Sequence, residues 1–177
     1  MKRLGELCDK TGNVTVYVKR DVKFDENTPY SVKRLCNMSD KVTVRVGLRK
    51  KGWCYVQMKE EKIIMSSVHL YPGDVSSLAQ LLSGSQSWQV KGCLALTNLS
   101  CDDWGELAQL VQSLDSLRLV FMTGVLPSQL KAQPLTEMVR HLWDKTERRC
   151  NWYVNGERYH KSDESLDLYT FLMRYCT

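Results

Sequence analysis

Apolar and polar residues alternate along several short stretches of the chain, which is the pattern of β-strands with one buried face. Valines alternate with more polar residues over residues 14–18, and the pattern returns over residues 42–46. Between these stretches, Thr28 and Pro29 predict a helix start, because threonine favours the N-cap and proline the first helical position. The first part of the chain is therefore predicted as strand, short helix, strand.

A polar interruption at Leu48–Gly52 separates the second of these stretches from another alternating run, Trp53–Met58. A glycine after polar residues, between two such runs, predicts a β-hairpin. The polar run Lys59–Lys62 then ends the alternation and marks a change of pattern.

From Lys62 onward, each stretch of about 28 residues contains one apolar strand followed by one amphipathic helix. The clearest internal match pairs Leu78–Leu82 with Leu107–Val111, at an offset of 29 residues. Four such units predict parallel strands joined by helices, and a regular period is typical of a solenoid. The expected strands are 65–70, 94–99, 117–121 and 151–154, and the expected helices are 78–82, 107–111, 135–142 and 166–173.

Residues 94–119 resemble a leucine-rich repeat: they hold an L-x-L-x-x-L strand, a polar segment with tryptophan and glycine, an L-A-x-L helix and a further leucine strand. The long helical variant is similar to the ribonuclease-inhibitor-like class, as in the C-terminal regions of NOD-like innate-immune receptors. Leu94, Leu96 and Leu99 are expected to point into the stack of units, because one unit alone cannot bury its apolar face. The resemblance covers residues 62–177.

We therefore predict an α/β fold with two segments. Residues 1–61 form a basic β-rich segment with one short helix, and residues 62–177 form a leucine-rich-repeat-like βα array of about four units with parallel strands. The alternative is a single closed α/β domain with a mixed sheet, in which the apparent repeat reflects successive βα units.

The net charge of +5 is unevenly distributed. Residues 1–62 contain 15 Lys/Arg and 8 Asp/Glu, whereas residues 63–177 contain 10 and 12. A hairpin tip with cations beside an aromatic residue can bind phosphate backbones and stack on bases. A solvated hairpin whose lysines protect a sheet edge is the interpretation we favour. The residues concerned are Arg45, Arg49, Lys50, Lys51 and Trp53.

Aromatic residues are concentrated late in the chain and are candidate anchors of a protein interface. Trp152 and Tyr153 are neighbours on the last expected strand, so their side chains point to opposite faces. One of the two is then exposed unless another segment covers it, and both are tentative binding residues.

No catalytic motif or paired set of catalytic side chains is recognisable, and His69, His141 and His160 are expected to be structural or solvated. We therefore assign no catalytic residue, no cofactor and no metal ligand. The seven cysteines include no C-x-x-C pair and are expected to be reduced, mostly buried thiols.

An apolar fraction of 43% with 25% charged residues is ordinary globular composition and excludes a disordered tail or a coiled coil. No apolar run approaches the ~18 residues that cross a bilayer, and the charged start is unlike a secretory leader, so we expect a cytoplasmic location and no membrane partner. We expect a non-enzymatic protein-interaction module, for which the resemblance implies ligand sensing or autoinhibition. The alternatives are nucleic-acid or polyanion binding through the basic hairpin, or an enzyme without a recognisable motif.

Overall fold

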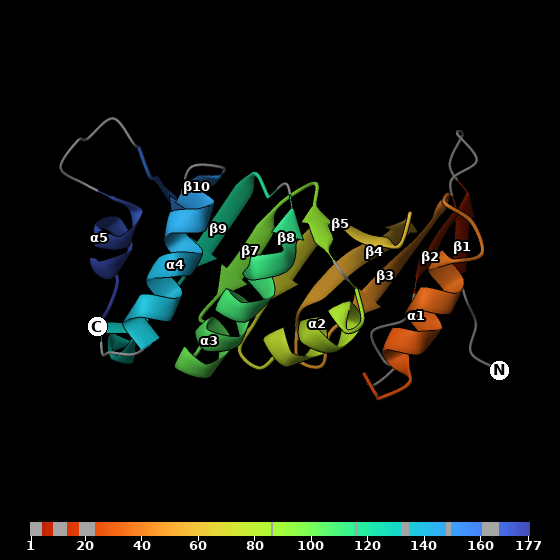
Figure 1. The fold of residues 1–177 in the computed structure, drawn as a ribbon, viewed down its shortest axis with the longest axis horizontal. Helices are drawn as coiled ribbons and strands as arrows, with labels where there is room; N and C mark the ends of the chain where they lie inside the picture. The colour runs from red at the N-terminus through yellow and green to blue at the C-terminus, as the bar shows by residue number, and fades with distance from the viewer. Residues whose placement is uncertain are drawn as a thin grey trace.

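The chain forms an α/β structure in which one mixed sheet carries helices on one of its faces (Figure 1). This structure is a computed structural model that describes residues 5–8, 14–17, 24–85, 87–115, 117–131, 135–147, 150–160 and 167–177. The predicted α/β class is confirmed.

The described strands are β1 (Gly5–Cys8), β2 (Val14–Tyr17), β3 (Val42–Gly47), β4 (Trp53–Lys59), β5 (Lys62–Leu70), β6 (Trp88–Val90), β7 (Leu94–Thr97), β8 (Leu114–Asp115), β9 (Leu119–Thr123), β10 (Asn151–Val154) and β11 (Glu157–Arg158). The described helices are α1 (Thr28–Cys36), α2 (Val75–Leu82), α3 (Cys101–Leu110), α4 (Leu135–Glu147) and α5 (Leu168–Met173). Two short 3-10 helices, η1 (Val111–Ser113) and η2 (Ser128–Lys131), follow α3 and β9.

The sheet has the order β1-β2-β3-β4-β5-β7-β9-β10-β11, with β6 beside β5 and β8 beside β6. Strands β5, β7, β9 and β10 are parallel neighbours and follow one another in chain order. Strand β6 pairs with the start of β5 and β7 with its end, so β6 and β7 together occupy the place of one interrupted strand. Figure 1 shows α1 to α4 side by side in chain order over one face of this sheet.

The N-terminal part combines both kinds of pairing. Strands β2 and β3 are parallel and are joined through α1, whereas β3, β4 and β5 are antiparallel. The predicted strand-helix-strand order and the hairpin at Leu48–Gly52 are thus confirmed. The predicted N-cap is shifted by one residue: Asn27 occupies the N-cap position of α1 without a side-chain capping hydrogen bond, and the Thr28 hydroxyl donates to Asp25 Oδ1 at 3.1 Å. Val18, which the strand prediction included, lies outside the described residues.

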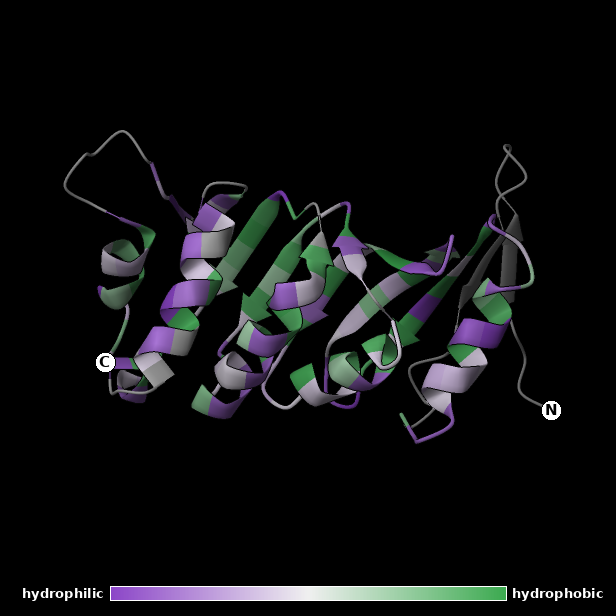
Figure 2. Ribbon diagram, viewed as in Figure 1, coloured by the Kyte–Doolittle hydropathy of each residue, from purple (hydrophilic) through white to green (hydrophobic). Residues whose placement is uncertain are grey.

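One apolar core lies between the sheet and the helices and runs through the whole array. Val44 and Val46 from β3 are fully buried in it, and so are Leu94, Leu96 and Leu107 further along the chain, each 2% exposed or less. Figure 2 shows β7 and β9 as mainly apolar ribbons and the neighbouring helix α4 as a ribbon with many polar residues. Of the leucines that carry the repeat pattern, Leu94, Leu96, Leu99 and Leu107 are therefore core residues.

The expected boundary at Lys59–Lys62 is a tight turn. Glu60 and Glu61 have φ angles of 52° and 62°, and Lys59 pairs directly with Lys62 across the β4–β5 hairpin. Two successive residues with positive φ make the turn type that suits the twist of a two-residue hairpin. The two predicted segments are joined here within one continuous sheet.

Two buried aspartates, 29 residues apart, each bind the backbone of an earlier loop: Asp74 binds the β3–β4 turn, and Asp103 binds the loop before α2. Asp74 is fully buried, and its carboxylate accepts backbone N–H groups of Lys50 and Gly52 at 2.7 Å and of Tyr71 at 3.1 Å. Asp103 forms a capping box with Ser100 and accepts the N–H of Gly73 at 3.0 Å. Asp74 is the N-cap residue of α2 and Asp103 lies in the first turn of α3, and at both positions a negative charge is also favoured by the helix dipole.

Several elements differ from the sequence prediction. The strand expected at 117–121 runs over Leu119–Thr123, and the helix expected from residue 166 is described from Leu168. Strands β1, β6, β8 and β11 were not predicted. The last three have only two or three residues, which are too few for a periodic pattern. None of the helices in the described ranges is long and apolar enough to span a bilayer.

Candidate functional site

The face of the sheet opposite the helices, which we name the helix-free face, is crossed by a row of side chains in register. The row begins on β4 and continues over β5, β7, β9, β10 and β11, each member being the Cα partner of the next. Because partners in register point to the same side of a sheet, these side chains lie in one line. This cross-strand row consists of Trp53, His69, Ala95, Phe121, Tyr153 and Arg158.

The cross-strand row contains two aromatic stacks with a small residue between them. The rings of Trp53 and His69 stack with centroids 4.0 Å apart and an angle of 19° between planes. Phe121 and Tyr153 stack at 5.1 Å and 28°. Ala95 separates the stacks, and Phe121 is 39% exposed although its strand neighbours Val120 and Met122 are buried. Apolar and aromatic surface is therefore open to solvent on this face.

Cationic side chains accompany the aromatic stacks. The Arg45 guanidinium lies 5.3 Å from the centre of the Trp53 ring, within cation–π distance. Arg158 donates to Asn151 Oδ1 at 3.3 Å. Burial lowers the pKa of His69 below its ordinary value.

Among the described side chains in the strands, the only carboxylate is that of Glu157, which accepts a hydrogen bond from the Tyr175 hydroxyl at 2.7 Å. Glu157 is the Cα partner of buried Val154, so it belongs to the face that the helices cover. The charged side chains described on the strands of the helix-free face are Arg45, Lys59, Lys62 and Arg158. Among the described strand side chains, that face is therefore basic as well as aromatic.

The two aromatic candidate residues on β10, Trp152 and Tyr153, lie on opposite faces of the sheet. Trp152 is 1% exposed and packs in the core beneath the helices, so it is removed from the candidate surface. Tyr153 lies on the helix-free face in its stack with Phe121. The expectation that the two point to opposite faces holds.

The basic hairpin is only partly joined to this site. Arg45 and Trp53 lie together on the helix-free face, whereas Arg49, Lys50 and Lys51 are exposed at the β3–β4 turn. Asp74 holds that turn through the backbone of Lys50 and Gly52. A shallow cavity there is lined by Gly47, Leu48, Lys50, Lys51, Gly52 and Tyr71.

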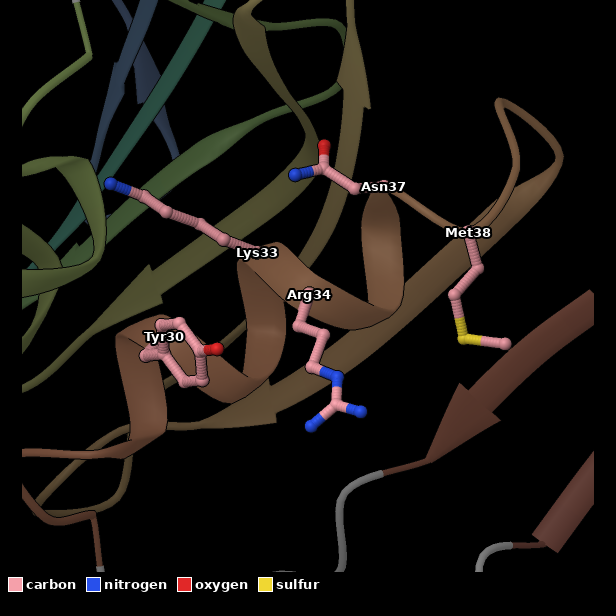
Figure 3. A pocket seen from close by; sticks show the side chains of 5 residues that line it. All are labelled: Tyr30, Lys33, Arg34, Asn37 and Met38. Atoms are coloured by element: carbon pink, nitrogen blue, oxygen red, sulfur yellow. The ribbon is translucent and has the colours of Figure 1, made fainter.

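A second exposed surface lies on the outer side of α1 (Figure 3). Tyr30 is 69% exposed and Met38 75%, while the Lys33 ammonium donates to the carbonyl of Ser83. The lining residues that the structure describes all belong to α1 and the two residues after it, so none of the other described elements forms a facing wall. This surface serves below as a matched control.

Sequence reasoning missed His69, Ala95, Phe121 and Arg158 as members of a site. The usable signal was their position one residue from a buried strand residue, which places them on the opposite face. Their alignment into one row depends on which strands pair and in which register. Neither the pairing nor the register can be derived from the sequence pattern alone.

The described residues contain no group of three or more histidine, cysteine, aspartate or glutamate side chains placed to hold a metal ion. Six cysteines, all except Cys8, are described as free thiols. No protein-family model, curated protein sequence or solved structure matches the chain.

Proposed function

We propose that the chain is a non-enzymatic protein-interaction module that binds a protein partner on its helix-free face. The observation that supports this most is the cross-strand row, in which two aromatic stacks remain open to solvent. Aromatic residues and arginine are the commonest energetic anchors of protein interfaces. A partner that covers the row removes its apolar surface from water.

The parallel part of the sheet supports the same proposal. Parallel sheets usually have both faces covered, whereas the helices here cover one face of β5, β7, β9 and β10. A leucine-rich-repeat-like array also has parallel strands in chain order with its helices on one side. We therefore retain the leucine-rich-repeat-like array as part of the proposal, with ligand sensing or autoinhibition as the role that the resemblance implies.

The test compares affinity capture by three forms of the chain, quantified by mass spectrometry. Wild-type chain is compared with Phe121→Ser/Tyr153→Ser, which removes the second stack, and with Tyr30→Ser/Met38→Ser, which removes two side chains of greater exposure from α1 and the segment directly after it. We expect a set of proteins that the first variant loses and the second retains. Equal recovery by all three forms contradicts binding through the helix-free face, provided that circular dichroism shows each form to be folded.

Polyanion binding is the second candidate, because Arg49, Lys50 and Lys51 are exposed together on a turn that Asp74 holds in place. Strands β3 and β5 lie on opposite sides of β4, so Arg45 and His69 approach Trp53 from two sides and compete with a base for its ring. A salt titration of single-stranded RNA binding tests this candidate. Steep salt dependence that Lys50→Ala/Lys51→Ala reduces supports it, and no binding at low salt rejects it.

A further inference from the structure

The cross-strand row has the dimensions of a binding track for a short extended chain. It crosses six strands, and neighbouring strands lie about 4.8 Å apart, so the row is about 24 Å long. An extended chain advances about 3.3 Å per residue and covers that length with about seven residues. The row therefore fits a linear segment lying across the strands.

The side chains along the row follow a nearly symmetrical pattern. Ala95 occupies the middle, with the Trp53–His69 stack on one side and the Phe121–Tyr153 stack on the other. Because Ala95 carries only a methyl group, the row is lowest there. An apolar side chain placed over Ala95 contacts a methyl group and the rings on both sides of it.

An arginine stands at each end of the pattern. Arg45 lies beside Trp53, and Arg158 is the Cα partner of Tyr153. Their described contacts are an aromatic ring for Arg45 and a neutral amide oxygen for Arg158, and neither has a carboxylate partner among the described residues. Both guanidinium groups retain donors for a bidentate bond to a carboxylate.

We propose that the helix-free face binds an acidic protein segment with an apolar centre, laid across the strands along the cross-strand row. Carboxylates at the two ends of that segment pair with Arg45 and Arg158, and an apolar side chain at its centre lies over Ala95. This proposal rests on the proposed function and adds the chemistry of the partner. Charge complementarity of this kind gives selectivity as well as faster association.

Trp53 is a natural fluorescent probe for binding at the cross-strand row. Four of the chain's five tryptophans, Trp88, Trp104, Trp143 and Trp152, are 1% exposed or less, whereas Trp53 is half-buried on the helix-free face. A change in tryptophan emission or in acrylamide quenching on binding therefore reports on the row.

The experiment uses the full chain and three synthetic peptides of about seven residues, long enough to cover the row. The first has two glutamates at each end and a Leu-Phe-Leu centre, the second replaces the glutamates by lysines, and the third replaces the centre by glycine and serine. We expect the first to bind, and the second and third to bind at least about tenfold more weakly, because each lacks one half of the recognition.

Charge-reversed variants test where the peptide binds. Arg158→Glu, at an exposed position, is expected to weaken the first peptide by about tenfold, and Arg34→Glu on α1 changes the net charge equally and is expected to leave binding unaltered. Arg158→Gln gives a second, milder variant if the reversal impairs folding. Filling the centre with Ala95→Phe is expected to abolish the preference for the apolar peptide.

Four outcomes overturn the proposal. The first is that the lysine peptide binds as tightly as the glutamate peptide, and the second is that Arg158→Glu and Arg34→Glu weaken binding equally. The third is that Lys50→Glu/Lys51→Glu abolishes peptide binding while Arg158→Glu does not. The fourth is that single-stranded RNA binds with the same dependence on Arg158. If no peptide binds but capture still depends on Phe121 and Tyr153, the partner chemistry is wrong and the proposed function stands. If capture is also independent of those residues, both proposals fail.

Discussion

The two faces of one sheet differ in what covers them, although the same strands build both. Val68, Leu94, Leu96 and Val120 point to the helices and are 2% exposed or less. Their neighbours one residue away point to the helix-free face, where Phe121 remains 39% exposed. The alternation thus places the core residues of each strand on one face and the side chains of the proposed binding surface on the other, so substitutions on the two faces are expected to have separable effects.

The largest difference is expected for a pair of adjacent residues on β7. Leu96→Ala is expected to lower the free energy of unfolding by about 2–5 kcal/mol, because it leaves a cavity in the core. Ala95→Ser changes the helix-free face at the preceding position and is expected to cost less than about 0.5 kcal/mol. Urea denaturation of both variants measures this, and similar losses would refute the division between faces.

A comparable effect is expected at the buried aspartate of the covered side. Asp74→Ala removes the acceptor of three backbone N–H groups and is expected to cost about 2–4 kcal/mol, since those donors lose their partner in a buried site. Asp102→Ala, at an exposed position in the first turn of α3, is the control and loses only a helix-dipole contribution of about 0.3–1 kcal/mol. Thermal unfolding of the two variants distinguishes these values. Equal shifts in Tm would show that the Asp74 hydrogen bonds add no stability beyond a helix-dipole contribution.

Thiol chemistry provides a probe of the covered face that needs no mutation. Burial raises the pKa of Cys36 to about 11 and that of Cys54 to about 12, so neither forms an appreciable thiolate at pH 8. Both are expected to resist iodoacetamide in the folded chain and to react in denaturant, whereas half-buried Cys93 reacts first. Peptide mass spectrometry after timed labelling reads the order. Early labelling of Cys54 would mean that its face is not covered.

The smallest effect is expected from His69 on the helix-free face. Because burial lowers its pKa in the folded chain, the unfolded chain binds the proton more readily. The stability due to neutral His69 is therefore present above the unfolded pKa of about 6.5 and is lost as pH falls from there through the lower folded pKa. Unfolding measured between about pH 7.5 and pH 5.5 should show a slightly weaker pH dependence in His69→Gln than in the wild type. A steeper dependence in the variant contradicts the assigned direction.

The sequence predicted the elements better than the site. The valines of β3 and the leucines of β7 and α3 predict their strands and helix, because in each element the apolar residues recur at a regular spacing on one buried face. Trp53 and Tyr153 were found because they are aromatic residues beside cationic or aromatic neighbours. His69, Ala95, Phe121 and Arg158 were not found, since their role arises from the successive pairing of six strands, and the two ends of that row, Trp53 and Arg158, are about a hundred residues apart in the chain. Trp152 was included because neighbouring residues on a strand point to opposite faces of the sheet. The sequence alone does not show which of the two faces the helices cover.

Binding on the helix-free face is tested most directly by a photo-crosslinking amino acid placed at single positions. Phe121 lies in the cross-strand row, and Tyr30 is the more exposed aromatic residue on the outer side of α1. With the crosslinker at residue 121, the same partner protein is expected to be captured repeatedly, and Arg158→Glu is expected to reduce its yield. With the crosslinker at residue 30, that partner is expected to be absent. Capture of the same partner at residue 30, and not at residue 121, would contradict the assignment of the helix-free face as the binding surface.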